Sequence, residues 1–227
     1  MSIQINLSKI KSTLPEHVTL VAVSKTKPVS DLMQAYDAGQ RVFGENKIQE
    51  MVDKWEQMPK DIEWHMIGHV QTNKVKYMAP FVSLIHGVDS LKLLEEINKQ
   101  ALKNNRIIDC LLQIHIAEEE TKFGLDEEEL KALLASPSFK EMKNIRIVGL
   151  MGMATFTDNQ NQIKKEFTHL KSVFDSLNSK DGSSRDALQY ISTMKILSMG
   201  MSGDYQLAIS CGSTMVRIGS SIFGGRS

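Results

Sequence analysis

Residues 18–25 read Val-Thr-Leu-Val-Ala-Val-Ser-Lys, a run of aliphatic and β-branched side chains that ends in a lysine. An apolar run without polar alternation is typical of a strand buried on both faces, as in a parallel sheet covered by helices. Similar runs recur along the chain, at Arg41–Phe43, Glu63–Ile67, Leu84–Val88, Cys110–Ile116, Ile145–Met151, Lys195–Met199 and Val216–Ile218. With Val18–Val23, they predict eight strands.

Segments with helical spacing lie between these runs. Ser90–Leu102 carries apolar residues at helical intervals behind an Asp-Ser cap, and Asp126–Leu134 opens with acids where the helix dipole favours them. Gln162–Leu177 places five apolar side chains on one face. Strands that alternate with helices predict an α/β fold.

Eight such units in 227 residues predict a single (β/α)8 TIM-type barrel domain over residues 1–227, with a doubly wound open sheet as the alternative. Ile3–Ser12 is predicted to form an extra helix that closes the bottom or the side of the barrel. The one plausible flexible stretch, residues 178–184, is too short to separate a second domain.

Composition narrows the function classes. The chain has 27 basic and 27 acidic side chains, so its net charge of zero provides no general attraction to nucleic acid or to anionic lipid. Two cysteines, Cys110 and Cys211, cannot build a disulfide framework or a cysteine-rich zinc site. The N-terminus lacks the pattern of a signal peptide, and no apolar run is long enough to span a membrane. We therefore expect a cytoplasmic protein.

The last fifth of the chain is poor in charge and rich in small residues. Residues 181–227 contain seven charged side chains, seven of the 14 glycines and ten serines. Glycine lets a backbone approach a ligand closely, and hydroxyl groups add hydrogen-bond donors. A flexible tail is the alternative, but the interleaved apolar runs favour a folded site for a small anion.

Lys25 is the first candidate functional residue. It follows a buried strand directly, and in a barrel the carboxyl ends of the strands are where active sites are built. A lysine attacks a carbonyl only when it is neutral, and burial beside another cation such as Lys27 lowers its pKa. A solvated surface lysine is the alternative.

Polar residues also follow the second and third predicted strands. Glu45 and Asn46 could orient a ligand, or simply cap the next helix. His65 and His69 lie four residues apart, but a strand-like run and a glycine interrupt the helix that such spacing needs for zinc. We therefore predict no metal site.

The C-terminal turns form the strongest group. Ser198–Asp204 and Cys211–Gly224 are Gly/Ser-rich segments around the last two predicted strands, where barrels often bind phosphate through backbone N–H groups. Arg217 lies within the last strand. It would form an ion pair inside the barrel, a hydrogen bond to a ligand, or both.

Five blocks of sequence together resemble one family. They are Ala22–Pro28, Phe43–Asn46, Trp64–Gly68, Leu197–Ser202 and Gly212–Gly219, followed by Ile222–Gly224. In this order they are similar to the pyridoxal phosphate homeostasis proteins, also described as YggS/PROSC-type proteins. The resemblance covers the chain from about residue 18 to residue 225.

The resemblance implies a barrel similar to the N-terminal domain of alanine racemase, with pyridoxal 5′-phosphate (PLP) as cofactor. It implies a Schiff base on Lys25 rather than on Lys27, and a ring nitrogen facing Arg217. It places the phosphate at Ser198, Ser202, Ser213 and Thr214, with Gly219 and Ser220 nearby. Asn46 and His65 are implied to line the pocket.

A cofactor carrier or buffer is the function that these expectations favour. An arginine at the ring nitrogen predicts a weak electron sink, and 227 residues leave no room for the second domain of a racemase. We expect a monomer without robust catalytic activity that exchanges PLP with free amino acids by transaldimination and delivers it to PLP-dependent apoenzymes. An amino-acid racemase, a Schiff-base aldolase and a pure protein-interaction module are the alternatives.

Overall fold

A computed structural model describes residues 2–119, 123–179 and 194–225. Its eight strands all pair in parallel and close on themselves in the order β1 to β8, because β1 pairs with β8 as well as with β2. The strands are β1 Thr19–Val23, β2 Val42–Glu45, β3 Glu63–Met66, β4 Leu84–Val88, β5 Ile108–Gln113, β6 Ile145–Met151, β7 Ile196–Ser198 and β8 Met215–Ile218. The predicted barrel is confirmed, and the open-sheet alternative is wrong.

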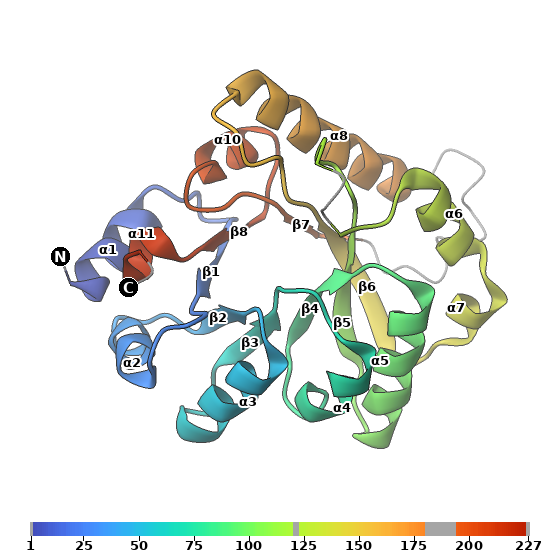
Figure 1. Cartoon of the computed structure of the whole chain (residues 1–227), viewed down its shortest axis with the longest axis horizontal. Coiled ribbons are helices and arrows are strands. Elements are labelled where there is room, and N and C mark those ends of the chain that lie inside the picture. Colours follow the sequence, from blue (N-terminus) through green and yellow to red (C-terminus); the bar gives the residue numbers. More distant parts are fainter. Residues whose placement is uncertain (1, 120–122, 180–193, 226–227) are drawn as a thin grey trace.

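Helices surround the strands on the outside (Figure 1). They are α1 Ile3–Ser12, α2 Val29–Asp37, α3 Ile48–Gln57, η1 Thr72–Lys74, α4 Val75–Met78, α5 Leu91–Lys103, α6 Glu127–Ala135, α7 Pro137–Glu141, α8 Gln160–Asn178, α10 Tyr205–Ser210 and α11 Ser220–Phe223. The cap predicted for α5 is present, since Ser90 accepts from the Leu93 N–H, and the acids predicted at the start of α6 include a capping box between Asp126 and Glu129. No helix in the described ranges is long and apolar enough to cross a membrane.

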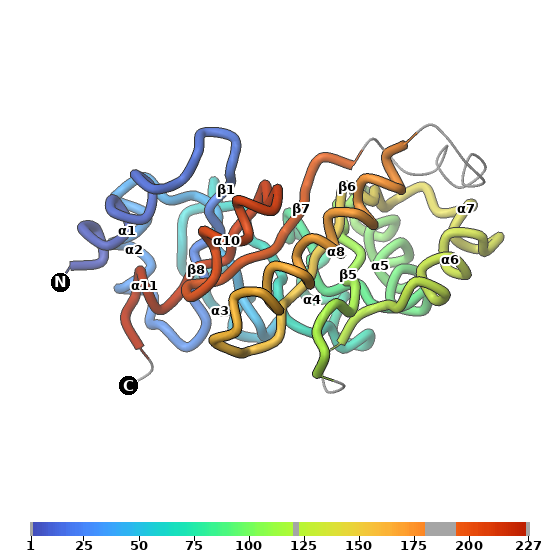
Figure 2. The backbone as a smooth tube through the Cα atoms, turned by 90° about the horizontal axis from the view of Figure 1, so that it is seen from above, coloured from blue at the N-terminus to red at the C-terminus, as the bar shows by residue number. Residues whose placement is uncertain are grey.

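The predicted N-terminal helix is α1, and it covers the side of the barrel. Asn6 donates its Nδ2 to the Ile222 carbonyl oxygen at 3.1 Å, which joins α1 to α11 after the last strand. Both views place α1 and α11 side by side (Figures 1 and 2). The first and last helices therefore meet beside β1 and β8. Most of the loop predicted at residues 178–184 lies outside the described residues.

Two apolar layers hold the barrel together. Between the strands and the helices lies the main core, and inside the barrel lies a smaller cluster of buried side chains: Val21, Leu84, Leu111, Met151 and Met215. Each interior residue is on a different strand, as expected where side chains alternate between the two faces. The interior of the barrel is thus packed below its carboxyl-end face.

The pairing of β6 with β7 depends on Gly149. It lies opposite Ile196, and a Cβ at residue 149 would come 1.8 Å from the Ile196 carbonyl oxygen. Neither strand can move away without breaking the ladder, so any larger residue forces a backbone shift.

We predict that Gly149→Ala lowers the free energy of unfolding by about 3 kcal/mol or more, measured by urea denaturation. Gly203→Ala is the matched control, because a Cβ there meets nothing within 4 Å. Equal urea midpoints for Gly149→Ala and the wild type would contradict the described pairing.

Candidate functional site

The barrel interior changes from apolar to polar toward the carboxyl ends of the strands. His86 lies two residues after Leu84, and Arg217 lies two residues after Met215; Leu84 and Met215 both belong to the interior apolar cluster. Residues two apart share one face of a strand, so these polar side chains form a layer directly above the apolar one. His65, Ser198 and Arg217 in this layer are all at most 4% exposed.

Arg217 connects the last three strands. Its Nη1 donates to the Ser198 carbonyl oxygen at 2.9 Å and to the Ser198 Oγ at 2.6 Å, and its Nη2 donates to the Gly152 carbonyl oxygen at 3.0 Å. It forms no ion pair with a carboxylate in the described residues, where its printed contacts are to carbonyl and hydroxyl oxygens. Burial lowers the pKa of Arg217 to about 10, which leaves it charged at neutral pH.

The Arg217 Nε–H has no hydrogen-bond partner in the described part of the chain, and it is not among the fully buried unpaired polar atoms. A guanidinium offers five N–H donors in a fixed fork. Three of these donors are used within the barrel, so the Nε–H and one Nη2–H remain, and Nε is the guanidinium nitrogen without a hydrogen bond in the described residues.

Two neutral histidines continue the polar layer. The His86 Nδ1 lies 3.1 Å from the Ser198 Oγ, and its Nε2 lies 3.1 Å from the His65 Nδ1. Burial lowers the pKa of His65 to about 3. Burial first, and then electrostatic repulsion by His65 and Arg217, lowers the pKa of His86 well below its ordinary value. Both imidazoles are therefore uncharged at neutral pH.

These contacts fix the direction of the hydrogen bonds. Ser198 Oγ accepts from Arg217, so its own proton is satisfied only by donation to the His86 Nδ1. Neutral His86 then carries its proton on Nε2 and donates it to the His65 Nδ1. This leaves His65 with its proton on Nε2. A chain of aligned donors thus runs from Arg217 to His65.

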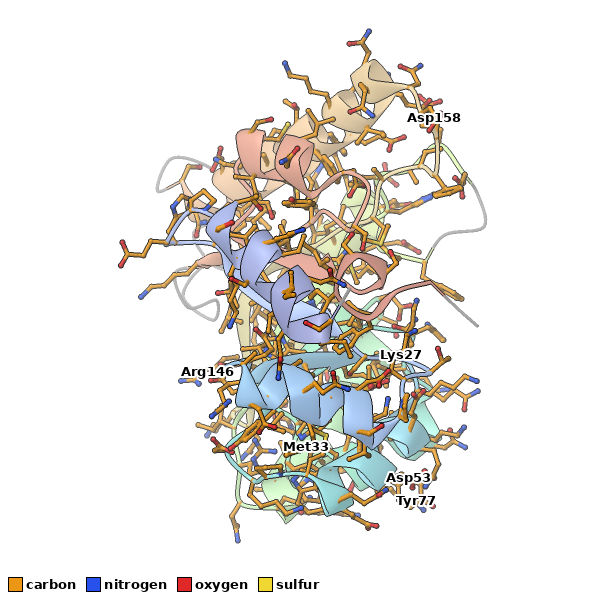
Figure 3. The ribbon with its side chains drawn as sticks, turned by 90° about the vertical axis from the view of Figure 1, so that its left-hand side faces the viewer. Lys27, Met33, Asp53, Tyr77, Arg146 and Asp158 are labelled. Atoms are coloured by element: carbon orange, nitrogen blue, oxygen red, sulfur yellow. The ribbon has the colours of Figure 1, made fainter. Side chains whose placement is uncertain are left out.

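Lys25 follows β1 at the same face of the barrel and is half-buried. The side chain of the preceding Ser24 points outward to Glu45, so alternation places Lys25 on the inner side. Lys27 has a different environment, since its Nζ donates to the Gly225 carbonyl oxygen at 2.9 Å. Figure 3 labels Lys27 at the edge of the barrel that also carries Asp158, whereas Arg146 lies at the opposite edge.

The turns after β7 and β8 meet beside the end of β1. The Gly219 N–H donates to the Ser202 Oγ at 3.3 Å. A Cβ at residue 219 would lie 3.0 Å from the Val23 carbonyl oxygen, so only glycine fits there without displacing a neighbour. Ser220 opens α11 and is exposed. The Ile222 and Phe223 N–H groups both donate to the Gly219 carbonyl oxygen, which leaves the N–H groups of Ser220 and Ser221 as the donors that this edge offers to an anion.

The structure brings most predicted site residues to the carboxyl-end face, namely Lys25, Asn46, His65, Ser198, Ser202, Arg217, Gly219 and Ser220. Ser198, however, uses its hydroxyl for Arg217 and His86.

Ser213 and Thr214 are not at this face, because both precede β8 and lie at its amino end. The Ser213 Oγ is within 3.2 Å of three backbone carbonyl oxygens, and the Thr214 Oγ1 accepts from the Leu197 N–H at 2.8 Å. Their hydroxyls are thus used in contacts that join the segment around β7 to the start of β8.

The structure also places the other residues that the sequence singled out near the second and third strands. Neither Glu45 nor Asn46 caps α3, whose N-cap position is Lys47 without a side-chain bond. His65 lies inside the barrel, whereas exposed His69 pairs with Asp89 at 3.2 Å and stacks on Phe123. In the described ranges, no three His, Cys, Asp or Glu side chains form a group that could hold a metal ion.

Sequence reasoning missed His86. It lies in a predicted strand, and its signal was a histidine two residues after an interior leucine. The complete arrangement combines a half-buried lysine, donors suited to an anion and a guanidinium nitrogen, the Arg217 Nε, whose N–H is unused. It can therefore bind an anionic aldehyde whose aromatic ring carries an acceptor nitrogen.

The chain is similar to proteins of known family. The family model of the alanine racemase N-terminal domain matches residues 1–227. A pyridoxal phosphate homeostasis protein of Aquifex aeolicus is 39% identical over 208 residues, covering 91% of this chain and 86% of that protein. The structure of PipY from Synechococcus elongatus PCC7942, with PLP bound, has a TM-score of 0.86 at 33% identity, covering 98% of this chain and 100% of that chain. Alanine racemase from E. faecalis shares the fold, with a TM-score of 0.76 at 17% identity over 99% of this chain and 58% of its own.

The buried histidines predict a loss of stability in acid. A histidine whose pKa is depressed in the folded state binds a proton more readily in the unfolded state. The stability that His65 contributes is therefore fully present above about pH 6.5 and is lost as the pH falls toward 3. The titration of His65 alone should lower the free energy of unfolding by about 2 kcal/mol between pH 7 and pH 5. Urea denaturation at the two pH values should therefore show a loss about 2 kcal/mol smaller for His65→Gln than for the wild type.

Exposed His17→Gln is the control and should follow the wild-type pH dependence. If His65→Gln and the wild type lose the same stability between pH 7 and pH 5, then His65 is not buried and neutral in the folded protein.

Proposed function

The chain belongs to the family of pyridoxal phosphate homeostasis proteins, and from this premise we propose that it binds PLP reversibly and serves PLP homeostasis as a carrier or buffer. It would act as a single-domain monomer in the cytoplasm. Its exchange partners would be free amino acids and PLP-dependent apoenzymes. The relative named for this role and the PLP-bound PipY structure support the proposal.

The residues of the site fit PLP. Lys25 would hold the aldehyde carbon, and the Gly219 turn with Ser202 and Ser220 would hold the phosphate. The observation that carries the assignment is the Arg217 Nε–H, on the guanidinium nitrogen that makes no hydrogen bond within the described residues. A pyridine nitrogen is an acceptor of one hydrogen bond and matches this unused donor. Asn46 and His65 would line the pocket.

Arg217 also favours storage over carbanion chemistry. Bound PLP supplies an aldehyde that reacts reversibly with amines and a ring that withdraws electrons, most strongly when its nitrogen is protonated. A guanidinium with a pKa of about 10 stays charged at neutral pH and opposes a second positive charge on the ring. The site would therefore bind and release amines at the aldehyde without strong activation of the α-carbon.

A racemase-like enzyme is the second candidate. It is favoured by the alanine racemase family model and by the fold shared with alanine racemase. Both candidates need the same lysine and the same anion-binding turns. They differ in whether the loaded protein removes the α-proton of an amino acid.

The covalent site is predicted to be Lys25. Purified protein loaded with PLP should absorb visible light, and borohydride should fix a pyridoxyl group that peptide mass mapping finds on Lys25. Lys25→Ala should lose the adduct, whereas the neighbouring control Lys27→Ala should keep it. An adduct on Lys27, or none in the wild type, would contradict this assignment.

The carrier proposal predicts no robust turnover. Holoprotein incubated with L-alanine or L-serine in deuterated water should exchange the α-proton at less than about a hundredth of a typical enzymatic rate of 10 per second. The measurement is the loss of the α-proton signal by NMR, with the Lys25→Ala variant as background. Exchange at an enzymatic rate that depends on Lys25 would favour the racemase-like alternative.

A further inference from the structure

A buried ion cluster lies on the outer side of the strand that leads to Lys25. Lys54 of α3 contacts two carboxylates, with its Nζ 2.7 Å from the Glu45 Oε1 and 2.7 Å from the Glu50 Oε1. The side chains of Lys54 and Glu45 are 6% and 0% exposed, and that of Glu50 is 23% exposed. We call Glu45, Glu50 and Lys54 the ion cluster.

The ion cluster binds the backbone on both sides of Lys25. The Lys54 Nζ donates to the Ser24 carbonyl oxygen at 2.8 Å, and the Thr26 N–H donates to the Glu50 Oε1 at 2.6 Å. The Ser24 Oγ also donates to the Glu45 Oε1 at 2.6 Å. The residues before and after Lys25 are therefore both held by side chains of the cluster.

The conformation of this segment needs such support. Thr26 has a φ of +62°, in the left-handed region that a β-branched residue rarely adopts. The Thr26 N–H bond to Glu50 and the Ser24 carbonyl bond to Lys54 keep this turn in place. A strained residue persists where its surroundings determine its conformation, and here the surroundings are the ion cluster.

The ion cluster is an unfavourable arrangement if its role is only to stabilise the fold. Burying an ammonium and a carboxylate costs desolvation energy that an apolar pair of similar volume would avoid. The Glu45 Oε2 is buried and has no hydrogen-bond partner within the described residues, a further cost. Burial raises the pKa of Glu45, while the charge of Lys54 opposes that shift. The contacts that the ion cluster makes hold the backbone at residues 24 and 26.

We propose that Glu50 and Lys54 are positioning residues that fix the peptide groups on both sides of Lys25 and thereby aim its amine at the aldehyde carbon of PLP. This inference rests on the proposed function. The attachment of an amine to a carbonyl depends steeply on the position of the attacking atom, and displacement by about 1 Å costs up to about a hundredfold in rate. Neither residue would touch the cofactor.

Lys54→Met is the direct variant, but it leaves Glu45 buried without its partner and can prevent folding. Glu50→Ala avoids this problem, because it removes the acceptor of the Thr26 N–H and retains the Glu45–Lys54 pair. Glu50→Gln keeps an acceptor oxygen for Thr26 and serves as the conservative rescue.

Glu96→Ala is the matched control. Glu96 lies on α5, pairs with Lys99 at 3.4 Å and has a side chain 22% exposed, close to the 23% of Glu50. It thus reproduces the loss of a half-buried helical carboxylate away from Lys25.

The experiment mixes each apo-protein with pyridoxal phosphate and follows the visible band, with borohydride trapping to confirm the adduct on Lys25. Glu50→Ala should load about tenfold more slowly than the wild type. Glu50→Gln should restore most of the rate, and Glu96→Ala should load at the wild-type rate. Thermal unfolding checks that each variant is folded.

Equal loading rates for Glu50→Ala and the wild type would overturn the inference, as would a Glu50→Gln variant as slow as Glu50→Ala. A wild-type protein that takes no pyridoxal phosphate on Lys25 would instead overturn the proposed function. The two failures are therefore distinguishable.

Discussion

A single buried guanidinium organises the carboxyl-end face of this barrel. Arg217 on β8 binds the Ser198 carbonyl and hydroxyl oxygens at the end of β7 and the Gly152 carbonyl oxygen after β6. A buried charge must be satisfied by hydrogen bonds, so the three strand ends cannot separate without exposing an unpaired cation. Through Ser198 the same contact reaches His86 and His65, and it determines which of their nitrogens carry protons.

The site has an inner and an outer support. Inside the barrel, the polar layer around Arg217 leaves the guanidinium Nε without a hydrogen bond in the described residues. Outside it, Lys54 and Glu50 hold the backbone on either side of Lys25. A reversible binder needs such preorganisation because any ordering on loading would reduce affinity. A neutral histidine pair and a charged arginine suit reversible attachment at an aldehyde better than strong activation of a carbon acid.

Much of the fold could be predicted because parallel strands buried on both faces leave continuous apolar runs. The predicted bounds of Leu84–Val88 and Ile145–Met151 agree with the structure residue for residue. The position of Lys25 at the carboxyl end of β1 was predictable because it ends such a run. Ser213 and Thr214 were misplaced because a hydroxyl-rich turn looks the same whether it precedes or follows a strand. Lys54 gave no signal, because a helical lysine reveals its buried partners only when the helix is docked against Glu45.

The protonation state of the bound ring nitrogen tests the central claim most directly. Arg217 would donate its Nε–H to that nitrogen and, as a charged guanidinium, keep it unprotonated. The measurement is the 15N chemical shift of pyridoxal phosphate labelled at the ring nitrogen and bound to the protein at neutral pH. A shift typical of a hydrogen-bonded, neutral pyridine is the predicted result, and a pyridinium shift would contradict the account.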